Sequence, residues 1–158
     1  MRTGGQLIVD ALEANGVDRL YCVPGESYLA VLDALHDSRI ETIVCRQEGG
    51  AAMMADCYGR LTGRPGICFV TRGPGATNAS IGLHTAFQDS TPMVLFVGDV
   101  ASDARDREAF QEVDYLSFFG PSTKGMAKRV ERIDDARRIP EYVARAYAVA
   151  MSVRPCPV

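Results

Sequence analysis

The stretch "GICFVTRGPGATN" (residues 66–78) contains an apolar run, then a turn with two glycines and a proline. The apolar run has the length of a buried strand, and a helical pattern follows from about Ala76 to Gln88. Glycine lets the bare backbone approach a neighbouring group closely, so a glycine-rich turn between a strand and a helix commonly binds a ligand. The stretch therefore predicts a strand, a binding turn and a helix in that order.

The same alternation fills the rest of the chain. Further strands are expected at 19–23, 41–45 and 92–98. A first helix is expected around Leu7 to Leu12, closed by Asn15-Gly16, and a second after a Ser27 cap, with Leu29, Leu32 and Leu35 on its apolar face. Two more are expected at 47–61, ended by Thr62-Gly63, and at 139–151. Near-continuous apolar strands that alternate with helices predict an α/β fold, a doubly wound, mostly parallel sheet with helices on both faces. In such a fold the loops that follow the strands gather at one edge, where ligands bind.

The C-terminal third is less regular. Residues 101–122 mix charged and aromatic side chains without periodicity, which indicates a long functional loop with short helical turns. A fifth strand is expected within 124–133, then a turn capped by Asp134-Asp135, with Pro140 at the first position of the last helix. The ending "SVRPCPV" is typical of a chain that re-enters the sheet, and a doubly wound domain normally continues into one more strand. We therefore expect one domain over 1–158, truncated before its last strand.

Composition narrows the class of protein. The chain has 158 residues, 47% of them hydrophobic, and a net charge of −3. This balance suits a soluble globular domain and gives no electrostatic footprint for nucleic acid or for an anionic membrane. The N-terminus has no signal-peptide pattern, and five cysteines without a CxxC pair indicate reduced core thiols in a cytoplasmic protein. With only two histidines in addition, no metal site is expected within the chain.

The glycine turn leaves several readings open. Gly73 and Gly75, and Asp99 at the end of the next strand, partly match a dinucleotide-binding fingerprint. However, Asn78 stands where the third glycine belongs, and Pro74 removes a backbone N–H. A phosphate-binding P-loop fails because no Gly-Lys-Ser/Thr follows. Dinucleotide binding and a purely structural tight turn remain alternatives.

Glu48 opens the helix predicted after the second strand. An acidic residue there is favoured by the helix dipole alone, which is a sufficient structural explanation. The next residues are Gly, Gly, Ala, Ala, Met and Met, so the carboxyl group has only small or apolar neighbours along the helix. A carboxyl group in such surroundings at a sheet edge is also suited to proton transfer. Both interpretations of Glu48 stay open on the pattern alone.

Three segments together resemble a known family. They are "RQEGGAAMMADCYGRLTGRPGICFVTRGPGATNA" (46–79), "FQDSTPMVLFVGD" (87–99) and "REAFQEVD" (107–114). They are similar to the N-terminal pyrimidine-binding domain of thiamine diphosphate-dependent enzymes, and most similar to the acetolactate synthase-like branch. The resemblance covers nearly the whole chain, with the motifs in the family's order and spacing.

The resemblance implies roles for individual residues. Glu48 matches the catalytic glutamate that hydrogen-bonds ring nitrogen N1′ of the cofactor's aminopyrimidine. The expected cofactor-binding residues are Gly73, Pro74, Gly75 and Asn78, which line the pyrimidine, and Pro24 and Gly25 at the mouth of the site. The expected substrate-channel residues are Gln47, Phe110 and Gln111. The turn is thus expected to hold an aromatic heterocycle rather than a phosphate.

The resemblance also implies cofactors, substrate and assembly. Thiamine diphosphate supplies an electron sink for carboligation or decarboxylation of 2-oxo acids, the chemistry of transferases and lyases. The family holds Mg²⁺ and the diphosphate in a separate domain with a Gly-Asp-Gly motif, whereas here Gly98-Asp99 is followed by Val100. That domain and the central domain, which in this branch is compatible with FAD, are expected to be absent. Family members pair subunits across the active site, so a homodimer or larger homo-oligomer is expected, and the chain alone should be inactive.

One departure keeps a further alternative open. Many relatives carry His before the glutamate, whereas this chain has Gln47. If that His handles substrate protons, the reaction differs in detail here. A degenerate, non-catalytic pyrimidine domain that serves assembly is therefore the alternative to a catalytic half-site.

Overall fold

The computed structural model describes residues 2–120 and 125–158. Its helices are α1 (Gly4–Ala14), α2 (Leu29–His36), α3 (Glu48–Thr62), α4 (Pro74–Gln88), α5 (Tyr115–Phe119) and α6 (Ile139–Met151), with short 3-10 turns η1 (Glu26–Tyr28) and η3 (Ala136–Arg138). Its strands are β1 (Arg19–Cys22), β2 (Glu41–Val44), β3 (Gly66–Val70) and β4 (Met93–Val97).

The four strands form one parallel sheet in the order β2-β1-β3-β4. The predicted doubly wound α/β fold is confirmed. The chain steps from β1 outward to β2 and then returns to the other side of β1 for β3 and β4. The strand order therefore reverses between β1 and β3, and such folds bind ligands in the crevice beyond the carboxyl ends of the strands at this point.

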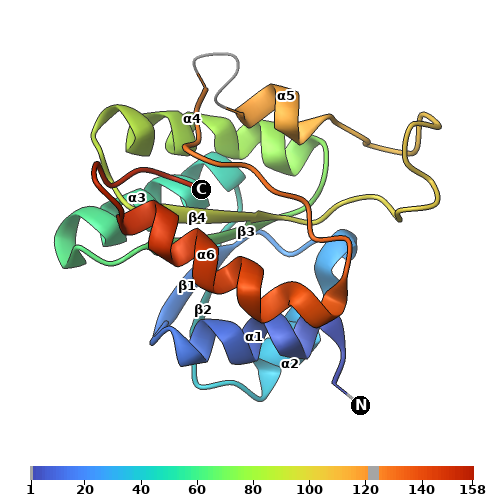
Figure 1. Ribbon diagram of the computed structural model, residues 1–158, viewed down its shortest axis with the longest axis horizontal. Helices are drawn as coiled ribbons and strands as arrows, with labels where there is room; N and C mark the ends of the chain where they lie inside the picture. Colours follow the sequence, from blue (N-terminus) through green and yellow to red (C-terminus); the bar gives the residue numbers. More distant parts are fainter. Residues whose placement is uncertain (1, 121–124) are drawn as a thin grey trace.

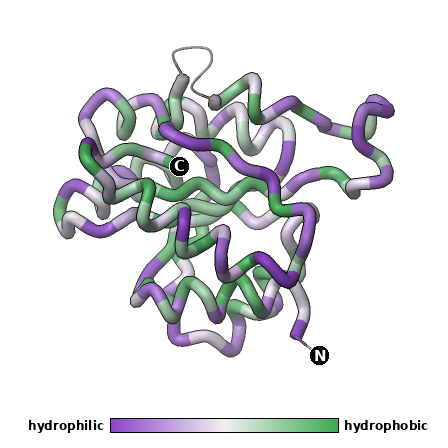
Figure 2. The backbone as a smooth tube through the Cα atoms, in the orientation of Figure 1, coloured by the Kyte–Doolittle hydropathy of each residue, from purple (hydrophilic) through white to green (hydrophobic). Residues whose placement is uncertain are grey.

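Helices cover both faces of the sheet (Figure 1). Helices α1, α2 and α6 pack together on one face, and α3 and α4 pack against each other on the opposite face. The hydrophobic backbone colouring of Figure 2 concentrates in the sheet between these layers. Every residue of β3 is buried, whereas β2 lies at the sheet edge with Glu41 and Val44 exposed. No helix in the described part of the chain is long and apolar enough to span a membrane.

Helices α3 and α4 cross at short range because the residues between them are small. A Cβ on Gly82 would lie 2.5 Å from the Cβ of Ala52. Ala51, Ala55 and Ala79 of the same two helices are fully buried alanines. This close crossing brings the first turns of the two helices, and the side chains on them, to the same edge of the sheet.

Most helix ends agree with the sequence, with three corrections. Asn15 closes α1 with Gly16 at a positive φ, Gly63 closes α3, and Asp135 caps η3. Helix α4 begins at Pro74, two residues earlier than predicted, and Pro140 takes the second position of α6 rather than the first.

The third correction concerns Ser27, which does not cap α2. Helix α2 follows directly on η1 and has no side-chain cap at its N-terminus. The Ser27 hydroxyl instead lies 2.7 Å from the hydroxyl of Thr71, in the loop after β3. A serine hydroxyl can serve any nearby backbone or side-chain partner, so its place before a helix did not determine its contact.

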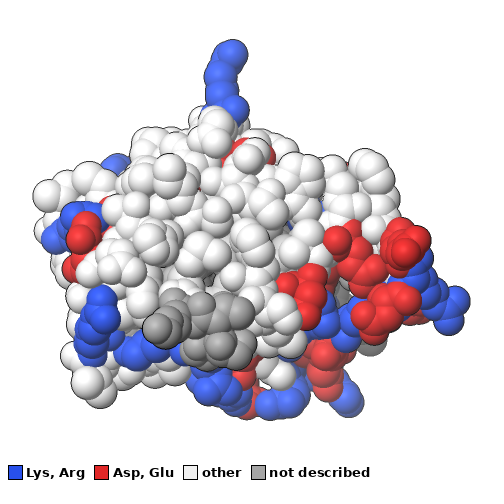
Figure 3. Space-filling model, turned by 90° about the horizontal axis from the view of Figure 1, so that it is seen from above, with Lys and Arg blue, Asp and Glu red and all other residues white. Residues whose placement is uncertain are grey.

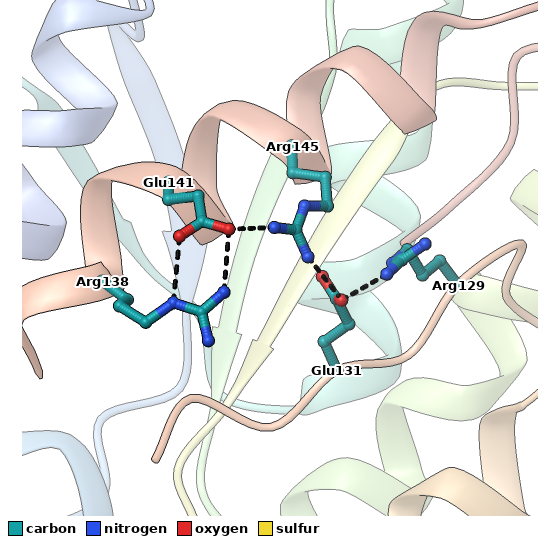
Figure 4. A network of polar contacts seen from close by, with 5 residues as sticks. All are labelled: Arg129, Glu131, Arg138, Glu141 and Arg145. Carbon is teal, nitrogen blue, oxygen red and sulfur yellow. Dashed lines mark hydrogen bonds and ion pairs between the residues drawn. The ribbon is translucent and has the colours of Figure 1, made fainter. Parts of the chain in front are cut away.

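The predicted fifth strand is wrong for residues 125–133, which contain no strand; Lys124 lies outside the described residues. Polar contacts hold this segment. Arg129 and Arg145 both bind the Glu131 carboxylate, and Arg138 and Arg145 both bind Glu141 on α6 (Figure 4).

The C-terminal residues occupy the edge of β4 beside that segment. Pro157 pairs in parallel with Met93. The Val158 N–H donates to the Met93 carbonyl at 2.9 Å, and the Leu95 N–H donates to the Val158 carbonyl at 2.9 Å. The prediction that the chain re-enters the sheet here is confirmed, and this pairing is why residues 125–133 cannot add to β4 at that point.

The predicted long loop is confirmed for residues 101–114, which form turns before the short helix α5. Pro121 and Ser122, at the end of the predicted loop, lie outside the described residues.

Candidate cofactor site

Glu48 lies at the first position of α3, at the carboxyl edge of the sheet, and is partly buried. Its Oε2 accepts a hydrogen bond of 3.1 Å from Nδ2 of Asn78 in the first turn of α4. Gln47 precedes it as the N-cap, and its side-chain oxygen accepts from the Gly50 N–H at 2.7 Å. The helix start therefore fixes the Glu48 backbone, while Asn78 fixes one oxygen of its carboxyl group.

The glycine turn forms the wall opposite Glu48. Gly73 has φ 59° and ψ −113°, a conformation that favours glycine. A Cβ on Gly75 would lie 2.9 Å from Cγ2 of Thr71 and 3.6 Å from Oε1 of Glu48. Oε1 thus faces the bare backbone of Gly75, and no side chain of the turn stands between them.

The two oxygens of the Glu48 carboxyl group differ in their hydrogen bonding. Oε2 is engaged by Asn78, whereas Oε1 has no hydrogen-bond partner among residues 2–120 and 125–158. Asn78 fixes one oxygen of the carboxyl group, and the other oxygen faces the backbone of Gly75. This second oxygen can form a hydrogen bond with the nitrogen of a ring that lies against Gly75. The residues present therefore fit an aminopyrimidine, because Oε1 of Glu48 is an available acceptor and the facing residue, Gly75, carries no side chain.

The loop after β1 meets the same turn. A Cβ on Gly25 would lie 2.5 Å from the Cβ of Thr71, so the two loops touch where only glycine fits. Pro24, beside it, is exposed at the rim. The structure thus places Gly25 against Thr71 in the loop after β3. That Pro24 and Gly25 form the mouth of a cofactor site stays a prediction.

The segment that carries Phe110 and Gln111 lies against the turn from the other side. Nε of Arg72 donates to the Phe110 carbonyl at 3.0 Å, and the guanidinium lies 6.0 Å from the centre of the Phe110 ring. That ring is 74% exposed. A Cβ on Gly73 would lie 2.6 Å from the Cβ of Gln111. Both residues border the site, and their role toward substrate, like that of Gln47, stays a prediction.

Neutral groups lie near the crevice. Burial raises the pKa of the Cys22 thiol to about 11, and burial also raises the pKa of Cys68 and of Tyr28. The negative charge of Glu48 adds to the increase in the pKa of Cys68 and of Tyr28, so these groups lie within its electrostatic reach. The thiols and the phenol therefore stay protonated at neutral pH and do not compete with Glu48 as charged groups.

An apolar cavity elsewhere in the domain is a separate feature. It has a volume of about 510 Å³ and lies between β4, residues 127–134 and α6, without contact to Glu48 or the glycine turn. Asp99 at its border pairs with Arg132 at 2.8 Å. Within the described residues, no group of three or more His, Cys, Asp or Glu side chains is placed to hold a metal ion.

Sequence reasoning missed four residues that shape the turn: Ser27, Thr71, Arg72 and Tyr115. Thr71 and Arg72 lie in the stretch 66–78, but their partners lie more than 35 residues away in the chain. Tyr115 accepts a hydrogen bond from the Gly73 N–H at 2.8 Å across 42 residues. No spacing pattern in the sequence encodes such contacts.

Taken together, the fold and these contacts define a parallel α/β domain with a candidate small-ligand site at its switch point. The family model described as "Thiamine pyrophosphate enzyme, N-terminal TPP binding domain" matches residues 2–118, and the chain belongs to this family.

Three relatives show how closely the chain follows one branch. The chain is 41% identical over 155 residues to the acetolactate synthase isozyme 2 large subunit of Escherichia coli, covering 98% of this chain and 28% of the relative. It is 41% identical over 147 residues to the acetolactate synthase of Bacillus subtilis, covering 93% and 25%. It is 38% identical over 159 residues to the mitochondrial acetolactate synthase catalytic subunit of Saccharomyces cerevisiae, covering 99% and 22%. The chain thus spans about a quarter of the length of these relatives.

Proposed function

We propose that this chain supplies the pyrimidine-activating half of a thiamine diphosphate-dependent enzyme that acts on 2-oxo acids in the manner of an acetolactate synthase. The observation that carries the proposal is the arrangement of Glu48, with Oε2 held by Asn78 and Oε1 facing the bare backbone of Gly75. Family membership identifies the heterocycle that would enter this space as the aminopyrimidine of thiamine diphosphate.

Each residue of the site has a task in this proposal. The Glu48 carboxyl group shares a proton with ring nitrogen N1′, and Asn78 orients the carboxyl group for that contact. Gly73, Pro74 and Gly75 let the ring lie against the backbone, and Pro24 and Gly25 close the mouth of the site. When bound, thiamine diphosphate supplies an electron sink for carbanion chemistry at the substrate carbonyl.

The rest of the enzyme is proposed to lie outside this domain. Asp99 follows Gly98 but pairs with Arg132, and no described metal cluster accompanies it, so these residues do not fit an Mg²⁺-diphosphate site. We place Mg²⁺ and the diphosphate contacts, and FAD if the enzyme uses it, in the further domains of a longer chain. The active site is then completed between subunits of a homo-oligomer in the cytoplasm, and residues 1–158 alone are inactive.

A chimera tests the catalytic role of Glu48. In it, residues 1–158 replace the corresponding N-terminal segment of the Escherichia coli relative, which aligns with 98% of this chain. We expect the chimera to form acetolactate and Glu48→Gln to lower kcat by about 10²- to 10⁴-fold, the usual contribution of a general acid–base group.

The control is Glu41→Gln, which removes an exposed carboxylate from the edge strand β2, away from the site. We expect this variant to keep the turnover of the chimera. If Glu48→Gln in an active chimera also kept normal turnover, the domain would serve assembly and not catalysis.

A further inference from the structure

The glycine turn is held by side chains that come from elsewhere in the chain. Arg72 and Gly73 carry the two backbone N–H groups ahead of Pro74, which has none. The Arg72 N–H donates to Oγ of Ser27 at 3.2 Å, and the Gly73 N–H donates to the Tyr115 hydroxyl at 2.8 Å. Both amides therefore depend on residues of two other segments, the loop after β1 and helix α5.

We propose that Ser27 and Tyr115 are positioning residues that fix the Arg72–Gly73 turn opposite Glu48 and so set the affinity of the site for thiamine diphosphate. The ligand in this statement rests on the proposed function, whereas the geometric part concerns this chain alone. Their side-chain hydrogen bonds within the described residues go to Thr71, Arg72 and Gly73 and not to Glu48, so both act through the turn.

The position of Tyr115 is fixed by burial and by ring packing. Its side chain is buried, and its ring stacks on Phe119 of the same helix, with ring centres 6.1 Å apart. Burial raises the pKa of the Tyr115 hydroxyl, so it stays neutral and can accept the Gly73 N–H at physiological pH. Gly73 has no side chain, and a Cβ there would meet Gln111 at 2.6 Å. Among the described residues the Tyr115 hydroxyl is the acceptor of the buried Gly73 amide. A buried amide without an acceptor is costly, so the turn should respond to this hydroxyl.

Ser27 is equally confined. Its Oγ accepts from Arg72 and exchanges a hydrogen bond of 2.7 Å with Oγ1 of Thr71. A Cβ on Gly98, at the end of β4, would lie 2.0 Å from the same oxygen, so only glycine at 98 leaves room for it. The hydroxyl thus joins the loops after β1, β3 and β4 at one point.

The turn is connected to the Glu48 carboxyl group through the first turn of α4. The Gly73 carbonyl accepts from the Thr77 N–H at 3.0 Å and so closes the first turn of α4. Asn78, the next residue, donates to Oε2 of Glu48. A shift of Gly73 therefore moves Asn78 and Gly75, which lie beside the two oxygens of the Glu48 carboxyl group.

The first test needs no cofactor. In Tyr115→Phe the ring and its stacking on Phe119 remain, and only the acceptor is lost. We expect the Gly73 amide of residues 1–158 to exchange its hydrogen about tenfold faster or more by NMR, as for a lost hydrogen bond to a buried amide. Tyr58→Phe is the matched control, since that hydroxyl donates to Asp18, between α1 and β1, and not to the glycine turn. An unchanged Gly73 exchange rate would overturn the proposal.

The second test uses the chimera with thiamine diphosphate. We expect Tyr115→Phe and Ser27→Ala each to raise the KM for thiamine diphosphate by about five- to fiftyfold with little change in kcat, whereas Tyr58→Phe leaves both unchanged. Normal KM in both variants would also overturn the proposal. If Tyr115→Phe fails to fold, Ser27→Ala with the exchange rate of the Arg72 amide decides in the same way.

The two proposals can fail separately. A chimera that neither binds thiamine diphosphate nor turns over would contradict the proposed function. Faster Gly73 exchange in Tyr115→Phe would, even then, support the role of Tyr115 in fixing the turn.

Discussion

Glu48 combines two physical roles in one side chain. At the first position of α3 its negative charge is favourable toward the positive end of the helix dipole, and its carboxyl group also faces the candidate site. The first role contributes to stability and the second does not, because Oε1 has no partner among the described residues. The two roles can therefore be separated by measuring stability and turnover on the same substitution.

We expect Glu48→Gln to change the free energy of unfolding of residues 1–158 by less than about 1 kcal/mol, the size of a helix-dipole interaction. The glutamine side chain keeps an oxygen that can accept from Asn78, so the local packing survives. Urea denaturation followed by circular dichroism gives the measurement. A loss of several kcal/mol would instead mean that Glu48 is a structural residue and would weaken its catalytic assignment.

For individual residues, the sequence predicted which ones lie at the carboxyl edge of the sheet, but it missed the hydrogen bonds between them. Glu48, Gly75 and Asn78 could be brought together because each follows a strand of a parallel sheet, whose carboxyl ends meet. Ser27 was misplaced and Tyr115 was overlooked because a hydroxyl bonds to whichever amide the tertiary fold brings near. That information is absent from local sequence.

At the scale of elements, the pair α3–α4 decides whether the site exists. Its helices carry Glu48 and Asn78 in their first turns, and small residues set the distance between the helix axes. A larger residue at the crossing must push the helices apart, since protein interiors have little free space. The same displacement would separate Asn78 from Glu48.

We expect Gly82→Ala to lower stability by about 1–3 kcal/mol, the usual cost of overpacking. Its Cβ would lie 2.5 Å from the Cβ of Ala52 and 2.7 Å from the Ala52 carbonyl carbon. Gly50→Ala is the matched control in α3, where the nearest atom to a new Cβ is 3.8 Å away; it should raise stability by roughly 0.5–1 kcal/mol. Thermal denaturation of both variants decides, and equal melting temperatures would show that the crossing is not tight.

The elements themselves were predictable where apolar periodicity was strong. All four strands and the long helices follow from the pattern, because apolar runs of strand length and helical spacing reflect burial directly. The segment 125–133 was wrong as a strand, because residues 157 and 158 occupy the edge of β4 that it would join. Its polar side chains instead join the ion-pair network with α6 (Figure 4).

For the whole molecule, buried thiols and phenols predict a loss of stability at alkaline pH. The pKa of Cys22 is about 11 in the folded chain and about 8.5 in an unfolded one, and burial also raises the pKa of Tyr28 and Tyr147. The unfolded state therefore releases protons first as the pH rises. Stability from Cys22 is present in full below about pH 8.5 and is lost as the pH rises toward 11, and the tyrosines add to the loss above about pH 10.

Urea denaturation between pH 7 and 10.5 in the presence of a reductant measures this effect. We expect the free energy of unfolding to fall steadily above about pH 8.5, near the pKa of a free thiol. Cys22→Ala should be less stable at pH 7 but show a shallower fall between pH 8.5 and 10. A flat profile for the unmodified chain would contradict the expected burial of these groups.

The outer surface of α4 is distinctive at the scale of the whole molecule. Helix α4 contains no Asp, Glu, Lys or Arg, and Figure 3 shows that the face above it is largely free of charged side chains, which gather at the rim. Ile81 in its centre is 59% exposed, and Met54 on the neighbouring α3 is 43% exposed. An uncharged surface that carries exposed apolar side chains beside a binding site is typical of an interface.

We propose that residues 1–158 self-associate through this face, as a homodimer that also covers the open side of the candidate cofactor site. Sedimentation equilibrium at high micromolar concentration should show the dimer, and Ile81→Lys should shift it to monomer by placing a charge in the interface. Leu29→Lys is the control, because Leu29 is similarly exposed, at 60%, but begins α2 on the opposite face of the sheet. A monomeric unmodified chain that binds no apolar dye would show that this face needs no partner, whereas equal dissociation by both lysine variants would place the contact elsewhere.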